Sequence, residues 1–149
     1  MRQASMLLFA LMIVLFSLSM TGYAVSNEGQ YIHFKEMAVD FNGTDAEVTL
    51  YYDLDMFSRV YVLLLGSYNL QPTLENVLFD FEEVEVVKIG NNHAVLYVKG
   101  ISRQNSEYYL HDSHDLGATV DVLTLIYPDG SSRSVPYATS TPYTFYGNE

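Results

Sequence analysis

One segment, residues 55–81, repeats its apolar residues at helical spacing, whereas the residues on either side alternate as strands do. Pro72 suits the first turn of a helix, where its missing N–H costs no hydrogen bond. The apolar positions that follow it recur at i, i+3, i+4 and i+7, the spacing of one helix face. They are Leu74, Val77, Leu78 and Phe81. We therefore expect this segment to pack against one face of a sheet that is built from the rest of the chain, and to form part of the core.

The first half of this segment has two interpretations. A helix would begin at Asp55, a good N-cap residue, and end near Gly66. A buried strand over residues 60–65 would give nearly the same apolar pattern, because the segment is apolar almost all round. We favour a helix, since the only turn signal before the segment is at residues 53–55. Under both interpretations these residues are core.

The first strands form a predicted hairpin. Residues 31–41 are rich in β-formers, Asn42-Gly43 is a strong turn signal, and residues 46–54 alternate cleanly.

The chain after the helical segment is expected to be strands and loops. The pattern predicts a polar loop at residues 103–107. It also predicts an edge strand at 132–137, because Pro136 cannot donate to a ladder. Further strands are expected at 82–89, 94–101, 108–110 and 118–127, with a last short strand in the tail, 140–149.

The expected fold class is α+β. It is an antiparallel β-sheet of about six to seven strands, covered by one or two helices inserted after the first hairpin. The chain has 149 residues and no cysteine, so an ordinary hydrophobic core, without disulfides, must stabilise it.

The N-terminus has the pattern of a secretory signal peptide. Arg2 precedes an apolar run, and Gly22 and Ala24 place small residues before a cleavage site. The alternative is an uncleaved membrane anchor, because residues 4–25 are 22 residues without a charge. The predicted organisation is thus a signal peptide or N-terminal transmembrane helix at residues 1–24, a linker at 25–30, and a single extracytoplasmic domain at 31–149. The protein is expected to be secreted or held at the membrane.

The charge is strongly acidic after the signal segment. Arg2 is the only charged residue among the first 24, so residues 25–149 carry six basic against 18 acidic groups, a net charge near −12. This field repels phosphate backbones and anionic lipid headgroups, and nucleic-acid binding is therefore not expected. Membrane contact is expected only through residues 4–25, if they are uncleaved.

The densest group of potentially reactive side chains is His111-Asp112-Ser113-His114-Asp115. Imidazole and carboxylate are ligands for divalent metals, and two histidines three residues apart reach one ion if the chain turns tightly there. His111, His114, Asp112 and Asp115 are accordingly the candidate metal ligands. The simpler interpretation is that these side chains stabilise a turn. Apart from such a divalent metal, no cofactor is expected, because Gly66 stands alone and forms no phosphate-binding pattern.

Two further features have both structural and functional interpretations. Asn42-Gly43-Thr44 is the one N-glycosylation acceptor in the chain, although Asn-Gly is sufficiently explained by the turn. The aromatic tail is either core or a platform for a sugar or peptide. Its residues are Tyr137, Tyr143, Phe145 and Tyr146.

The function most consistent with these features is an exported, non-catalytic domain for binding or structure, with an unidentified protein or glycan partner at the cell surface. One alternative is a metal-binding exported protein that uses the residue 111–115 cluster. A second is a small secreted hydrolase. The sequence contains neither Gly-x-Ser-x-Gly nor His-Glu-x-x-His, and nominates no catalytic residue, so an enzyme is the weaker hypothesis.

Overall fold

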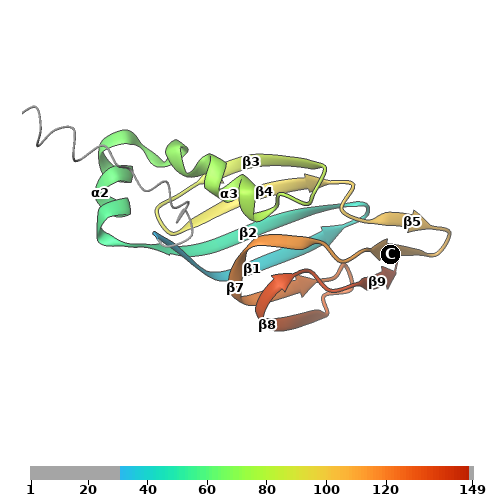
Figure 1. Ribbon diagram of the computed structural model, residues 1–149. Helices are drawn as coiled ribbons and strands as arrows, with labels where there is room; N and C mark the ends of the chain where they lie inside the picture. Colours follow the sequence, from blue (N-terminus) through green and yellow to red (C-terminus); the bar gives the residue numbers. More distant parts are fainter. Residues whose placement is uncertain (1–30, 148–149) are drawn as a thin grey trace, which may run out of the picture.

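The computed structural model describes residues 31–147, which are mostly β-strand with two short α-helices (Figure 1). The first hairpin is followed by the helical region and then by seven strands. The elements are β1 Ile32–Asn42, β2 Asp45–Leu54, α2 Met56–Leu65, the 3₁₀ helix η1 Ser67–Leu70, α3 Gln71–Val77, β3 Glu83–Ile89, β4 His93–Lys99, β5 Arg103–Asn105, β6 Tyr108–His111, β7 Asp115–Ile126, β8 Ser132–Ser140 and β9 Thr144–Gly147.

Six strands form the main sheet in the order β3-β4-β2-β1-β7-β8. The hairpin predicted around Asn42-Gly43 is confirmed, and Asn42 pairs with Asp45. The predicted edge strand is also confirmed as β8. The expectation of an antiparallel sheet is wrong at one place, because β1 and β7 are parallel and the sheet is mixed. The reason is that β4 ends beside Ala46, near the β1–β2 turn, and the chain returns through residues 100–119 before Val120 pairs with Phe34, so β7 runs in the same direction as β1.

A bulge in β1 explains its imperfect alternation. The pairing with β2 shifts between Phe34 and Glu36, so Lys35 is an extra residue. Inward-facing positions are therefore even-numbered before the bulge and odd-numbered after it, as in Met37 and Val39, which are fully buried. The bulge thus keeps one face of a long strand continuously apolar.

A second, smaller sheet has the order β5-β6-β9. The short strand expected in the tail is confirmed as β9. The loop predicted at residues 103–107 is wrong in part, since Arg103–Asn105 pairs with Tyr108–His111 as a hairpin. The sequence did not indicate this strand because its side chains are polar. Polar side chains are tolerated there since β5 lies at a sheet edge, where they are solvated. Figure 1 shows the small sheet and α2 at opposite ends of the molecule.

The helix expected at residues 55–65 is present as α2, so the buried-strand alternative is excluded. Only α3 and the residues around it act as the predicted cover: Leu74, Val77 and Leu78 are buried in the core. The prediction that the first half of the segment 55–81 belongs to the core is wrong. In α2 only Val62 is buried, because the helix lies beyond the end of β2 rather than across the sheet (Figure 1).

The predicted signal peptide or anchor at residues 1–24 and the linker at 25–30 lie outside the described residues. Within residues 31–147, neither helix reaches the length and apolar character needed to cross a bilayer.

Candidate binding site

Local sequence defines both ends of α2. The Asp55 carboxylate accepts a hydrogen bond from the Ser58 N–H at 2.7 Å, which caps the N-terminus. At the other end Gly66 has a φ of +89°, and its N–H donates to the Val62 carbonyl at 2.8 Å. This φ is not helical, and glycine adopts it readily whereas residues with a Cβ rarely do. Gly66 therefore ends the helix. These two residues fix a ten-residue helix between β2 and η1.

One side of α2 is an exposed apolar surface, which we call the outer face. Its side chains are between 51% and 79% exposed, and they surround a shallow depression together with Ser58. The outer face consists of Met56, Phe57, Val60, Tyr61 and Leu64. A helix apolar on nearly all sides is ordinarily buried, so among residues 31–147 this surface is the clearest departure from a self-contained core.

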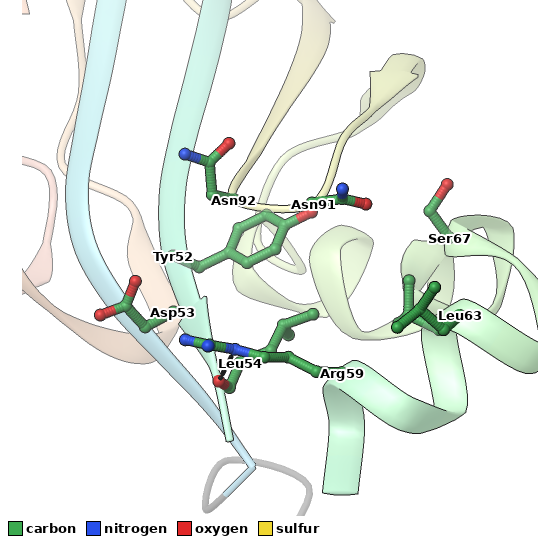
Figure 2. Close-up of a pocket in the computed structure, with 9 residues that line it drawn as sticks. Tyr52, Asp53, Leu54, Arg59, Leu63, Ser67, Asn91 and Asn92 are labelled. Carbon is green, nitrogen blue, oxygen red and sulfur yellow. Dashed lines mark hydrogen bonds between the residues drawn. The ribbon is translucent and has the colours of Figure 1, made fainter. Parts of the chain in front are cut away.

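The other side of α2 forms one wall of a cavity of about 730 Å³, which we call the α2 cavity. Its floor is apolar, with Leu54 of β2 and Val62 of α2 both buried. Asn91 and Asn92, in the turn between β3 and β4, lie at the opposite rim. Figure 2 shows the Tyr52 ring between this turn and Arg59. The cavity therefore combines an apolar floor with polar groups at its edges, as small-molecule sites do.

Arg59 supplies the positive charge of the α2 cavity. Its Nε donates to the Leu54 carbonyl at 2.9 Å, which fixes the side chain across the end of β2. Within residues 31–147 it forms no ion pair at 4 Å or less. The neighbouring carboxylate, Asp53, bonds instead to the Lys35 ammonium at 2.6 Å. That hydrogen bond, more than the charge of Arg59, holds the pKa of Asp53 below its ordinary value.

Tyr52 is a structural donor rather than an acid–base group. Its hydroxyl donates to the Gly90 carbonyl at 2.7 Å, and burial raises the pKa of Tyr52 to about 12. The phenol therefore stays protonated at neutral pH. The residues lining the cavity include no histidine and no cysteine, and Asp53 is their only carboxylate. This set of side chains suits binding better than proton transfer.

The predicted metal cluster is a folded turn. His111 is fully buried, and its Nδ1 donates to the Ile101 carbonyl at 2.9 Å, because a carbonyl only accepts. Its Nε2 then accepts from the Thr141 hydroxyl, also at 2.9 Å. Burial lowers the pKa of His111, in agreement with a neutral ring. The turn does bring His111 and His114 together, with ring centroids 5.6 Å apart.

The other candidate ligands point to different partners. His114 Nδ1 donates to the Asp80 carbonyl at 3.1 Å, and Asp112 pairs with Arg103 at 2.8 Å. The N–H of Asp115 bonds to the Asp80 carboxylate. In the described part of the chain, no three His, Cys, Asp or Glu side chains gather around one position for an ion.

The metal hypothesis remains a prediction with a direct test. A Zn²⁺ ion bound only to the folded state adds about 2.7 kcal/mol of stability at 100 times its dissociation constant. The gain should disappear in His111→Ala/His114→Ala.

Asn42 is exposed at the first hairpin turn, and its glycosylation also remains a prediction.

The aromatic residues of the tail differ in burial. Tyr146 lies in the core and donates its hydroxyl to the Gly43 carbonyl at 2.8 Å. Tyr137, Tyr143 and Phe145 are exposed. The core interpretation is therefore correct only for Tyr146.

Sequence patterns did not indicate the α2 cavity. Arg59 occurs inside an apolar run, and Asn91-Asn92 belongs to a short polar stretch of the kind that is typical of turns. The chain matches no family model, and no similar curated protein or solved structure is found. The geometry of the site is therefore the basis for assigning a function.

Proposed function

We propose that this protein is an exported, non-catalytic binding domain that lies on a membrane surface, with the outer face of α2 in the bilayer interface. The observation that carries the proposal is the exposure of that face: its five large apolar and aromatic side chains are each more than half exposed. Transfer from water to an apolar surrounding stabilises each such side chain by roughly 1.5–3 kcal/mol when burial is complete. A short helix of this kind lies in the interface rather than crossing it.

The position of α2 supports a bilayer as the partner. The N–H of Asp55 donates to the Tyr31 carbonyl at 3.2 Å, so α2 begins where the described chain begins. Residues 26–30 separate this point from the uncharged apolar stretch of residues 4–25. Five residues extend to at most about 18 Å. If residues 4–25 remain in a membrane, α2 is therefore held close to its surface.

The charge distribution fits an apolar rather than an electrostatic contact. Arg59 is the only charged residue of α2, and it faces the α2 cavity, away from the outer face. The acidic remainder of the domain opposes binding to anionic headgroups. Association through α2 should therefore be strongest on zwitterionic lipid and nearly independent of salt.

The chain contains no cysteine, so a single introduced cysteine can carry an environment-sensitive fluorophore. The full chain is reconstituted in phosphatidylcholine vesicles with the label in Leu64→Cys, on the outer face. The matched control is Val87→Cys, an exposed apolar position on β3. The fluorophore at position 64 should show blue-shifted emission and quenching by spin-labelled acyl chains, whereas that at 87 should not. A fluorophore at 64 that stays in water, or equal quenching at both positions, would exclude the proposal.

A further inference from the structure

We propose that the α2 cavity binds a small organic carboxylate, with its anionic group on Arg59 and its apolar body against Leu54 and Val62. This inference uses the inner side of α2 and does not depend on membrane contact of the outer face. The cavity volume of about 730 Å³ is within the usual range of small-molecule sites, roughly 300–1,000 Å³.

The guanidinium group is available for an anion. Of its five N–H donors, the one on Nε bonds to the Leu54 carbonyl, which orients the group. The remaining four are on the two terminal nitrogens, for which residues 31–147 provide neither a hydrogen bond nor an ion pair. Two parallel N–H donors match the two oxygens of a carboxylate, and such charge-assisted pairs are among the stronger hydrogen bonds in proteins.

The surrounding charges permit an anion at this place. Asp53 is the only acidic side chain that lines the cavity, and Lys35 compensates its charge through the 2.6 Å ion pair. The acidic groups elsewhere act at longer range, and salt screens charges more than about 8–10 Å away. The local balance is therefore one positive charge, on Arg59.

The rest of the cavity favours a ligand with an apolar body. Leu54 and Val62 form a floor that is 5% and 8% exposed, and Leu63 forms a wall. Across the Tyr52 ring, Asn91 and Asn92 offer amide groups to a polar substituent (Figure 2). An aryl- or alkyl-carboxylate can pair with the guanidinium group and also bury its apolar body against the floor. An inorganic anion can only pair with the guanidinium group.

The test uses 3-phenylpropionate and its neutral analogue 3-phenylpropanamide on the full chain in phosphatidylcholine nanodiscs, with empty nanodiscs as background. Binding is measured by ligand-detected NMR titration. The carboxylate should bind more tightly than the amide, and Arg59→Gln should weaken the carboxylate about tenfold or more, which corresponds to 1.4 kcal/mol. Arg59→Lys keeps the charge but loses the two-donor geometry, so its affinity should be intermediate.

The matched control is Arg103→Gln, which removes an equal charge from the small sheet at the other end of the molecule. It should leave the affinity unchanged. Thermal unfolding of each variant verifies that the fold is intact, and Arg59→Lys provides the decisive comparison if Arg59→Gln fails to fold. Equal binding of acid and amide, an unchanged affinity in Arg59→Gln, or no binding of the acid at millimolar concentration would each overturn the proposal.

Discussion

At Gly117 the backbone of β7 passes so close to the end of α3 that a side chain does not fit. A Cβ built on this residue would lie 2.0 Å from the Asn76 carbonyl oxygen, far inside contact distance. The neighbour is backbone, which cannot rotate away. We expect Gly117→Ala to destabilise the domain by about 3 kcal/mol, the upper part of the usual range for overpacking. Urea unfolding followed by circular dichroism measures the loss.

Gly147 provides the matched control for this substitution. It also lies in a strand, β9, but a Cβ there meets nothing within 4 Å. Gly147→Ala should therefore change the free energy of unfolding by no more than about 0.5 kcal/mol. Equal effects of the two substitutions would show that the contact with Asn76 is not the cause.

The Asp45 carboxylate stabilises the first hairpin in a pH-dependent way. Hydrogen bonds from the Gly100 N–H at 3.0 Å and the Tyr97 hydroxyl at 2.8 Å hold the pKa of Asp45 below its ordinary value of 3.8. The unfolded chain therefore takes up a proton first as the pH falls, and stability decreases through this range. Above the unfolded pKa the contribution is fully present.

We expect Asp45→Asn to flatten the acid side of the stability curve. The amide cannot ionise, so the part of the decrease that belongs to Asp45 disappears, while the other carboxyl groups contribute equally in both proteins. Urea unfolding at pH values from about 6 to 3 gives the two slopes. Parallel curves for wild type and variant would contradict the assignment.

Single residues limit how much of the site the sequence predicts. The i, i+3 spacing allows His111 and His114 to approach each other only if the chain turns tightly between them, and in the structure their rings do approach. It could not predict that Ile101 and Thr141 occupy both nitrogens of His111, because these residues come from distant segments. The α2 cavity could not be predicted for the same reason. Arg59 and Asn91 line one cavity only because of tertiary folding, and neither belongs to a local motif.

At the scale of elements, α2 is a helix specified by its ends rather than by its packing. The Asp55 cap is its main local determinant, and Asp55→Ala should destabilise α2 by about 1 kcal/mol. Because α2 is attached to the core mainly through Val62, we expect local opening rather than global unfolding. Hydrogen exchange of the α2 amides should become about fivefold faster, while β1 and β2 stay unchanged.

Asp55→Asn retains a side-chain acceptor for the Ser58 N–H and serves as the control. Its α2 amides should exchange nearly as slowly as in the wild type. A similar acceleration in both variants would indicate that the charge at the helix terminus, and not the cap, is responsible.

Most elements were predictable from periodicity, but their partners were not. Alternation and turn residues located β1, β2 and β8, and helical spacing located α2 and α3. The parallel pairing of Ile32–Asn42 with Asp115–Ile126 joins strands more than 70 residues apart, and no local pattern encodes it. Likewise, the apolar pattern of α2 is the same whether a core, a partner or a membrane covers it.

At the scale of the whole molecule, the stable and weakly attached parts lie at different places. Central strands β1, β2, β4 and β7 contribute most of the fully buried side chains, whereas α2 contributes one buried residue. The small sheet lies at the end remote from α2 (Figure 1). A partner that covers α2 should therefore change the stability of one end only.

Hydrogen exchange of the full chain tests this arrangement. With the outer face in water, the α2 amides should exchange much faster than those of the central strands, because opening α2 exposes little additional apolar surface. In phosphatidylcholine nanodiscs the α2 amides should become protected, since lipid then covers Phe57 and Leu64 and opening must expose them again. Exchange in β6 and β9 should stay the same in detergent-free vesicles, nanodiscs and any lipid mixture. Protection of α2 that equals β1 without lipid would mean that the chain itself covers the outer face, and a bilayer would then not be required.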